Sequence, residues 1–238
     1  MMTQYKLRNL ATGREFNDEG WTLNDPAYDK PSLIRADYTE KQLNLRDPSL
    51  GIYRFSGWLP VNRFLNNAPV TITYKSEKLA DKLGLKNLYI AYSGYWPEIG
   101  ANMTTCSFKE TEAYSVCARL SEESKKILVV ASAGNTARAF AKVCSENHIP
   151  LLLVVPFDNR DAMWFREKLN PCVKLICTPK GSDYFDAIDL SAKICKSNIF
   201  IEEGGARNIA RRDGMGTTVL SATTFIGRIP DYYFQAIG

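Results

Sequence analysis

The sequence has 238 residues, of which 45% are hydrophobic and 24% are charged. A chain of this size and composition can bury a sizeable core without disulfides, which excludes an extensively disordered protein. Its 30 basic and 26 acidic side chains give a formal net charge of +4 and form no block of like charges, so no nucleic-acid partner is implied.

The N-terminal stretch MMTQYKLRNLATGREF lacks the apolar segment of a signal peptide. The longest apolar runs, 127–131 and 149–156, are far shorter than the ~20 residues that cross a bilayer. We therefore expect a cytoplasmic protein without a membrane partner. The six cysteines form no CxxC pair and are predicted to be reduced, buried thiols, and the only histidine, His148, is predicted to end a helix. No metal site is expected from these spacings.

The first third of the chain is interrupted by turn-forming residues, and we predict an extended wrapping segment there. These residues are Gly13, Gly20, Pro26, Pro31, Pro48, Gly51 and Pro60. From Pro69 onward, the runs PVTITY and LYIAY predict two short strands. Between them, SEKLADKLG predicts a helix that ends at Gly84.

Strands and helices then alternate along the chain, which predicts a parallel sheet covered by helices on both faces. The predicted strands are 127–131, 151–155, 173–177 and 199–201, and the predicted helices are 136–148, 161–169, 183–196 and 214–227. A last apolar strand is predicted at 231–238. Because ligand-binding turns follow the strands of such sheets, we expect a further turn and a second half of the protein beyond Gly238.

Lys109 follows a run of small hydroxyl residues in TTCSFKETEAYSVCARL and opens an amphipathic helix. A cation in the first helical turn is disfavoured by ~0.3 to 1 kcal/mol, because this end of the helix dipole is positive. Conversion of the amine to an imine with a carbonyl cofactor would remove that penalty. The alternative is a surface lysine paired with Glu110 or Glu112, and position alone favours this alternative.

The segment VVASAGNTARAFA places the loop 132–136 between a buried strand and a helix. Its small residues and the free N–H groups of the first helical turn are typical of a site for a carboxylate or a phosphate. The alternative is a simple helix cap, in which Ser132, Asn135 or Thr136 accepts hydrogen bonds from the backbone.

Taken together, these two segments resemble the threonine synthase group of fold-type II pyridoxal-phosphate enzymes, which have the tryptophan synthase beta-like fold. The run Ser107-Phe108-Lys109 resembles the segment that carries the family's Schiff-base lysine, and the loop 132–136 is similar to its SxGNT loop. The resemblance implies a role for each matching residue. Lys109 would bind the cofactor covalently, and Asn135 would hydrogen-bond the cofactor ring oxygen. The substrate carboxylate would be held by Ser132, Gly134 and Thr136. Gly238 would begin the turn that binds the cofactor phosphate.

Longer strings, among them SGYWPEIGANMTTCSFKE, GSDYFDAI and EGGARNIARRDGMGT, are similar to one branch of this group. That branch replaces the phosphate of O-phospho-L-serine with sulfite, giving L-cysteate for coenzyme M biosynthesis in methanogens. The chain departs from typical threonine synthases at Glu110-Thr111, where that group has an Asp-Arg pair.

The resemblance implies that both the leaving group and the nucleophile are anions, so their site should be rich in positive charge or hydrogen-bond donors. The candidate donors are the hydroxyls of Thr104, Thr105 and Ser107 and the guanidinium groups of Arg207, Arg211 and Arg212. The alternative for the arginines, which the sequence favours equally, is that they lie on the solvated face of a helix, since Arg207 and Arg211 are four residues apart. Trp164 is expected to be an anchor in the core or in an interface.

Three functional alternatives remain open from the sequence. The chain could be a threonine synthase acting on O-phosphohomoserine, a non-catalytic fragment of such an enzyme, or a nucleotide-binding module, although neither GxGxxG nor GxxxxGK[ST] occurs. We expect residues 1–105 to form the wrapping segment and the start of a larger domain, residues 106–200 a smaller α/β domain, and residues 201–238 a return to the larger domain. A homo-oligomer is possible.

Overall fold

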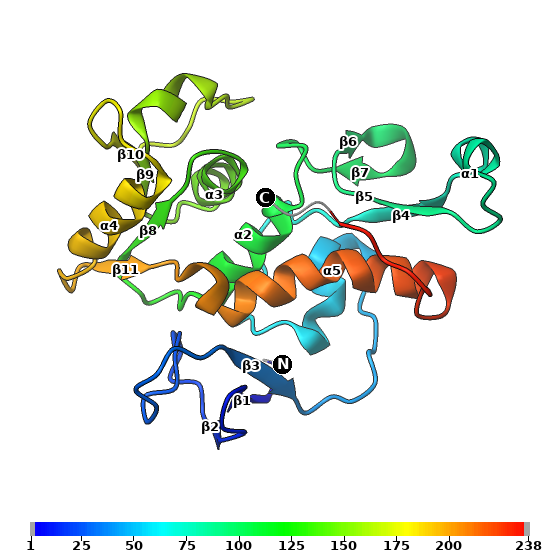
Figure 1. Cartoon of the computed structure of the whole chain (residues 1–238), viewed down its shortest axis with the longest axis horizontal. Helices are drawn as coiled ribbons and strands as arrows, with labels where there is room; N and C mark the ends of the chain where they lie inside the picture. The colour runs from blue at the N-terminus through cyan, green and yellow to red at the C-terminus, as the bar shows by residue number, and fades with distance from the viewer. Residues whose placement is uncertain (1–2, 236–238) are drawn as a thin grey trace.

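The computed structural model describes residues 3–235 as a mixed α/β structure (Figure 1). The strands are β1 (Tyr5–Asn9), β2 (Glu15–Phe16), β3 (Ile34–Tyr38), β4 (Ile72–Lys75), β5 (Tyr89–Tyr92), β6 (Tyr95–Trp96), β7 (Ala101–Asn102), β8 (Ile127–Ala131), β9 (Leu151–Val155), β10 (Val173–Cys177) and β11 (Phe200–Glu202). The α-helices are α1 (Glu77–Leu83), α2 (Lys109–Arg119), α3 (Asn135–Glu146), α4 (Tyr184–Ile194) and α5 (Ile209–Ile226), and 3-10 helices cover Pro48–Trp58, Pro97–Ile99, Phe157–Ala162 and Gly205–Arg207.

The predicted parallel sheet is confirmed, with the strand order β10-β9-β8-β11. Leu128 pairs with Leu151 and Val173 pairs with Leu151 on its other side, so the pairs β8–β9 and β9–β10 are both parallel. β11 is added in parallel on the free edge of β8. The chain therefore proceeds outward from β8 to β10 and then returns to the opposite side of β8. This reversal of direction lies between β8 and β11.

Helices cover both faces of this sheet, as the alternation of strands and helices along the chain predicts. Leu128 and Val130 of β8 point to the face covered by α3, where they are buried in one cluster with Phe140. Val129 points to the opposite face and packs with Ala187 of α4. Figure 1 shows the two helices on either side of the strands.

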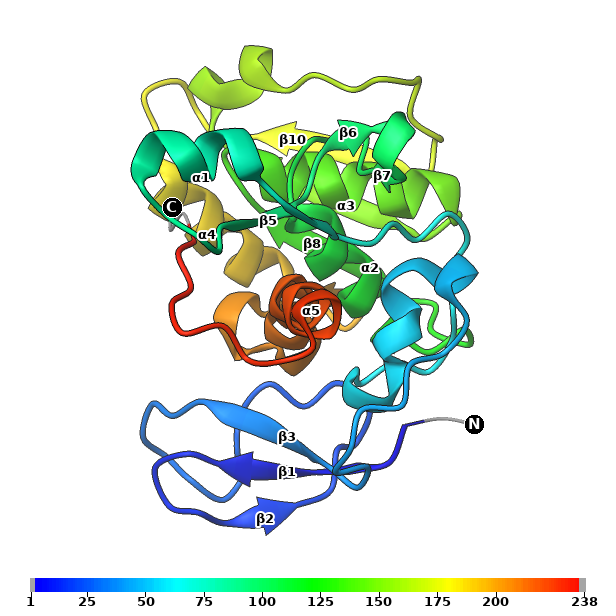
Figure 2. The ribbon, with the colours of Figure 1, turned by 90° about the vertical axis from the view of Figure 1, so that its right-hand side faces the viewer.

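The helices α2 and α5 cross at the centre of the molecule, and Figure 2 shows α5 end-on beside α2. Gly214 makes this close approach possible. A Cβ atom built at Gly214 would lie 2.6 Å from the carbonyl oxygen of Thr111 and 2.7 Å from Cβ of Ser115. A glycine is therefore required where α5 passes over α2.

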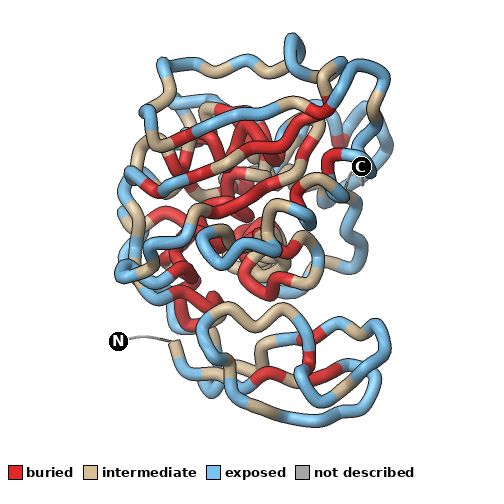
Figure 3. The backbone as a smooth tube through the Cα atoms, turned by 90° about the vertical axis from the view of Figure 1, so that its left-hand side faces the viewer, coloured by how far each residue is buried: buried red, intermediate tan, exposed pale blue. Residues whose placement is uncertain are grey.

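The wrapping segment contains a three-stranded antiparallel sheet, β2-β1-β3. The sheet has a small buried cluster of its own, formed by Leu7 and Ile34 with Ile209 of α5, and it lies beneath the body that holds the main buried core (Figure 3). Arg119 of α2 connects the two parts, because its buried guanidinium donates to the Asp18 carboxylate (2.8 Å) and to Asn208 (2.9 Å). The division of the chain into three parts at residues 105 and 200 stays a prediction.

The predicted helix at 161–169 is wrong. A 3-10 helix ends at Ala162, and the chain then runs irregularly as far as Pro171. Met163, Phe165 and Leu169 all pack against the main core. Side chains with this spacing cannot share one face of an α-helix, because each residue turns the helix by about 100°.

The predicted strand at 231–238 is also wrong for the residues that are described, because residues 231–235 form no strand and pair with none of the described strands. Gly238 lies outside the described residues. The helix predicted at 214–227 begins earlier, at Ile209, since the Asn208 side chain accepts a hydrogen bond from the N–H of Ala210 and so caps the helix there. Cys106 is exposed, so the prediction that all the cysteines are buried is wrong for this thiol.

Candidate functional site

The loop 132–134 follows β8 at its carboxyl end, where the strand order of the parallel sheet reverses. Glu203 follows β11 at the same edge of the sheet, and its backbone N–H donates to the carbonyl of Val129 in β8. Ligands of open α/β sheets bind in the crevice that such a reversal leaves at the carboxyl ends of the strands. The fold therefore places the predicted anion loop at the position that most favours a ligand.

Lys109 is the first residue of α2, as the sequence predicts. Its ammonium lies 2.7 Å from a carboxylate oxygen of Glu112 and 4.5 Å from the centre of the Phe108 ring. One-fifth of the side chain is exposed, so a small molecule can reach it. The predicted pairing with Glu112 is thus present, but the lysine side chain is largely enclosed.

Glu112 joins Lys109 to the loop after β8 through Arg211 of α5. The Nε of Arg211 donates to the second carboxylate oxygen of Glu112 (2.8 Å), and another of its nitrogens donates to the Thr136 hydroxyl (3.3 Å). A third donates to Glu203 (2.9 Å). Residues from four segments therefore share one buried network of charges.

The charges in this network alter the proton affinities of its members. Burial lowers the pKa of Arg211, but the charges of Glu203 and Glu112 outweigh burial and leave that pKa raised. Burial also raises the pKa of Glu203 above its usual range, against the opposing effect of Arg211. Arg211 is consequently a permanent cation that holds two buried carboxylates in place.

The loop 132–136 both caps α3 and leaves donors free. The Ser132 hydroxyl accepts from the N–H groups of Gly134 (3.2 Å) and Ala137 (3.1 Å), which is the predicted capping arrangement. Within residues 3–235, the N–H groups of Asn135 and Thr136 have no acceptor. A methyl group built on Gly134 would meet no atom within 4 Å, so open space adjoins these donors.

Arg138 makes a second connection between the two predicted motifs. It donates to the Asn135 side-chain oxygen (2.9 Å) and to the Thr105 carbonyl (3.0 Å). Its Nε donates to the Trp164 carbonyl (3.2 Å), and its guanidinium carbon lies 3.4 Å from the centre of the Trp164 ring. The segment before α2 and the N-terminal end of α3 are therefore held together by one buried side chain.

Thr105 and Ser107, which precede Lys109, are buried and only partly paired. The N–H of Thr105 donates to Glu110, whose carboxylate also lies 3.3 Å from the Lys142 ammonium. The Ser107 hydroxyl accepts from the N–H of Lys109 (3.3 Å). The hydroxyl of Thr105 is buried and has no hydrogen-bond partner among the described residues.

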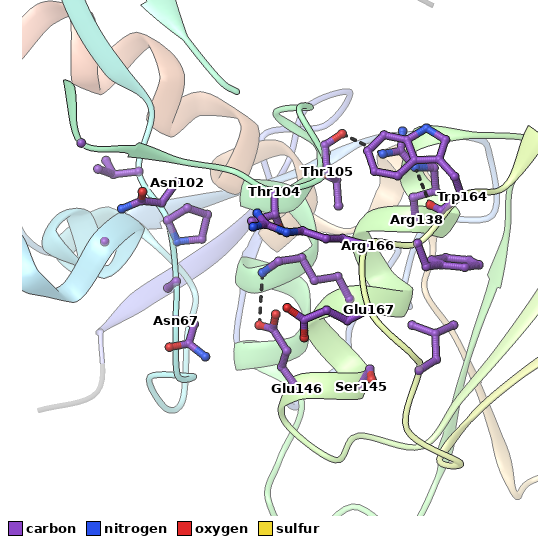
Figure 4. Close-up of a pocket in the computed structure, with 18 of the residues that line it drawn as sticks. Asn67, Asn102, Thr104, Thr105, Arg138, Ser145, Glu146, Trp164, Arg166 and Glu167 are labelled. Atoms are coloured by element: carbon purple, nitrogen blue, oxygen red, sulfur yellow. Dashed lines mark hydrogen bonds and ion pairs between the residues drawn. The ribbon is translucent and has the colours of Figure 1, made fainter. Parts of the chain in front are cut away.

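A cavity of about 520 Å³ adjoins Thr105 and Arg138 (Figure 4). Figure 4 shows Arg138, Thr105 and Trp164 together on one side of it, and Glu146 and Ser145 on another. Lys109 does not line this cavity. The cavity is thus adjacent to the candidate site, and the two are linked by Arg138.

The structure gathers most of the predicted site residues at the N-terminal ends of two neighbouring helices. Lys109, Thr105 and Ser107 lie at or just before the start of α2, and Ser132, Gly134, Asn135 and Thr136 lie at the start of α3.

Of the three candidate arginines, only Arg211 contacts these site residues. Arg207 pairs with Glu202, and Arg212 donates to the Ile34 carbonyl, so these two are structural. Arg138 was not among the predicted site residues, although its position three residues after Asn135 on a helix was an available signal.

These residues fit a pyridoxal-phosphate cofactor. The Lys109 amine is partly accessible, and the Asn135 side chain is exposed. The Thr105 hydroxyl has no hydrogen-bond partner among the described residues, so a ligand could bind to all three groups. The free N–H groups beside Gly134 suit the carboxylate of an amino-acid substrate. No group of three or more His, Cys, Asp or Glu side chains in residues 3–235 could hold a metal ion.

Residues 66–238 match the family model described as "Pyridoxal-phosphate dependent enzyme". The whole chain is 48% identical to the cysteate synthase of Methanosarcina barkeri, of which it covers 56%. It is 48% identical to the cysteate synthase of Methanosarcina mazei and 44% identical to that of Methanocorpusculum labreanum, covering 56% and 57% of these proteins. The chain thus spans a little over half the length of the curated relatives that it matches.

Among solved structures, the chain is similar to apo diaminopropionate ammonia lyase from Escherichia coli, with a TM-score of 0.53 and 14% identity over 77% of this chain and 55% of that one. It is also similar to maize serine racemase, with a TM-score of 0.50 and 17% identity over 66% of this chain and 45% of that one. At this level of identity the likeness concerns the fold alone. None of the helices formed by residues 3–235 has the length and apolar character needed to cross a membrane.

Proposed function

Because the chain belongs to the fold-type II family of pyridoxal-phosphate dependent enzymes, we propose that it takes part in a β-replacement reaction. In this reaction, sulfite replaces the phosphate of O-phospho-L-serine and gives L-cysteate and inorganic phosphate. The observation that carries the proposal is the network through which Glu112 and Arg211 connect Lys109 to Thr136. The similarity to cysteate synthases over the whole chain supports the choice of substrate.

Lys109 is proposed to hold the cofactor through its side-chain nitrogen. When bound, pyridoxal phosphate withdraws electrons from the substrate's α-carbon, which makes the α-proton acidic. The Lys109 nitrogen is then the base that takes this proton and later returns it. Glu112 fixes the position of that nitrogen, because its carboxylate is itself held by Arg211.

The substrate carboxylate is proposed to bind at the start of α3. The N–H groups of Asn135 and Thr136 lack acceptors within the described residues, and the positive end of the α3 dipole favours an anion there. Gly134 leaves room for close approach. We propose that Ser132 keeps the loop in this shape through its two hydrogen bonds, and that Asn135 faces the cofactor ring oxygen.

Thr105 and Ser107 are proposed to face the substrate from the other side, where the Thr105 hydroxyl lacks a partner. Gly238 is proposed to begin the turn that binds the cofactor phosphate.

We further propose that the reaction serves coenzyme M biosynthesis in a methanogen, that it occurs in the cytoplasm, and that the complete enzyme acts as a homo-oligomer. Because the chain spans 56% of its relatives, the activity is proposed for the whole protein.

The test is an assay of the full-length protein with O-phospho-L-serine and sulfite, in which cysteate is identified by mass spectrometry. We expect cysteate and phosphate to form in equal amounts and to require added pyridoxal phosphate. Turnover of O-phosphohomoserine alone would instead identify a threonine synthase. Failure to bind the cofactor would identify a non-catalytic protein.

A further inference from the structure

We propose that Arg138 is a positioning residue, which fixes the side-chain amide of Asn135 with its NH₂ group directed toward the cofactor. The inference rests on the proposed function, because it concerns the residue that would contact the cofactor ring oxygen. Arg138 lies just beyond the loop 132–136, and no role is predicted for it from the sequence.

The orientation follows from the chemistry of the guanidinium group. Arginine has five N–H donors and no acceptor, so the atom of Asn135 that lies 2.9 Å from Arg138 must be the carbonyl oxygen. The NH₂ group of Asn135 is then turned away from Arg138, and it donates to none of the residues 3–235. Since a ring oxygen that carries negative charge needs a donor, this is the orientation in which Asn135 can serve it.

Arg138 is itself held rigidly. Only 7% of it is exposed, and its three hydrogen bonds go to Asn135, to the Thr105 carbonyl and to the Trp164 carbonyl. Its guanidinium carbon also lies over the Trp164 ring, 3.4 Å from the ring centre (Figure 4). A planar fork with several donors can satisfy these partners at once, whereas a lysine ammonium cannot stack and reach all three.

The electrostatics show that Arg138 does not serve as half of a structural ion pair. No carboxylate of the described residues lies within 4.0 Å of it, and all three of its acceptors are neutral oxygens. Burial lowers the pKa of Arg138, and the charges of Cys106 and Glu110 only partly offset this. Burying a cation without a charged partner costs free energy. The contacts that Arg138 gains in return are with Asn135 and Thr105 of the candidate site and with Trp164 of the adjoining loop.

The first experiment measures side-chain order without any cofactor. In ¹⁵N NMR relaxation of the protein, the NH₂ signal of Asn135, identified by its loss in Asn135→Ala, should report an ordered group. In Arg138→Met the same signal should become mobile, while in Arg166→Met it should not change. Arg166 is a suitable control because it lines the same cavity and stacks on Tyr95 without contacting Asn135. An equally ordered signal in Arg138→Met would overturn the inference whether or not the proposed function holds.

The second experiment uses the protein with pyridoxal phosphate bound and compares the absorbance maximum and the cofactor dissociation constant. Arg138→Met and Arg138→Lys should shift the band in the same direction as Asn135→Ala and weaken binding by ~5- to 150-fold, the loss expected for one hydrogen bond to a charged or buried group. If Arg138 acts through Asn135, the double variant Asn135→Ala/Arg138→Met should be no worse than Asn135→Ala alone.

The outcomes separate the inference from the proposed function. Additive effects in the double variant, or a wild-type spectrum in Arg138→Met, would show that Arg138 does not position Asn135. A wild-type protein that forms no absorbance band would instead contradict the proposed function, and the NMR comparison would still decide the geometry.

Discussion

The Lys109 ammonium lies 2.7 Å from the carboxylate of Glu112, one turn further along α2. This contact explains how a lysine is tolerated at the positive end of a helix dipole, because the carboxylate supplies a compensating negative charge. The same carboxylate is held by Arg211 of α5, so the position of Lys109 depends on the packing of α2 against α5.

Replacement of Glu112 should therefore destabilise the protein. In Glu112→Gln, the buried Arg211 loses one of its two carboxylate partners, and we expect the free energy of unfolding to fall by about 2 to 4 kcal/mol. Urea unfolding measures this loss. The matched control is Glu122→Gln, since Glu122 is 72% exposed and lies 3.6 Å from Arg63, and this change should cost less than about 1 kcal/mol. Equal losses in the two variants would show that the network around Glu112 is not important for stability.

Substitution of Gly134 should impair substrate binding and leave the fold intact. A methyl group at this position meets no protein atom within 4 Å, so Gly134→Ala should unfold at the same urea concentration as the wild type. In the proposed function the methyl group would occupy the approach of the substrate carboxylate, and the KM for O-phospho-L-serine should rise at least ~10-fold, equivalent to ~1.4 kcal/mol. An unchanged KM would place the substrate carboxylate elsewhere.

Two glycines of α5 provide a test of the helix packing. Gly214→Ala should destabilise the protein by about 1 to 3 kcal/mol, because the new methyl group would lie 2.6 Å from the Thr111 carbonyl oxygen and force α2 and α5 apart. Gly216→Ala, in the same helix but next to open space, should instead stabilise it by about 0.5 to 1 kcal/mol. Thermal unfolding of both variants should show shifts of opposite sign, and shifts of the same sign would contradict the observed packing.

Asp213 should make the stability depend on pH. Burial raises its pKa to about 6, although the hydroxyl of Tyr38 and the charges of Arg212 and Arg119 oppose this. Between about pH 4 and pH 6 the unfolded chain releases this proton while the folded protein retains it, so stability falls as the pH rises through this window. The full loss is about 3 kcal/mol, since a tenfold change in proton affinity is worth ~1.4 kcal/mol.

Asp213→Asn removes the titrating group but keeps an acceptor for Tyr38. Urea unfolding at several pH values should show that this part of the pH dependence is absent from the variant. The difference in stability between wild type and variant would then change between pH 4 and pH 6. A constant difference across this range would contradict the assignment.

Much of the fold can be predicted from the sequence, because its strands and helices have strong local patterns. The buried strand of β8 and the amphipathic α3 both match their apolar spacing, and the capping residue Asp183 marks the start of α4. The segment at 161–169 also has a helical composition. It is not helical, because Met163, Phe165 and Leu169 pack against the main core from positions that one helix face cannot present, and such long-range contacts leave no signal in local periodicity.

The candidate site was only partly predictable for a similar reason. Lys109 and the loop 132–136 are recognised as local motifs, but they lie apart in sequence and nothing local shows how they meet. Arg211, which connects them, is 99 residues away from Glu112. Its helix α5 reaches the site only because Gly214 permits the close crossing with α2.

We propose that Lys109 is the residue that binds the cofactor covalently. Borohydride reduction of the protein with pyridoxal phosphate, followed by mass mapping of the modified peptide, tests this role. We expect the label on Lys109. Lys109→Ala should lose both the label and the visible absorbance band, and the exposed control Lys126→Ala should keep both. A label on another lysine, or an unchanged band in Lys109→Ala, would show that Lys109 does not bind the cofactor.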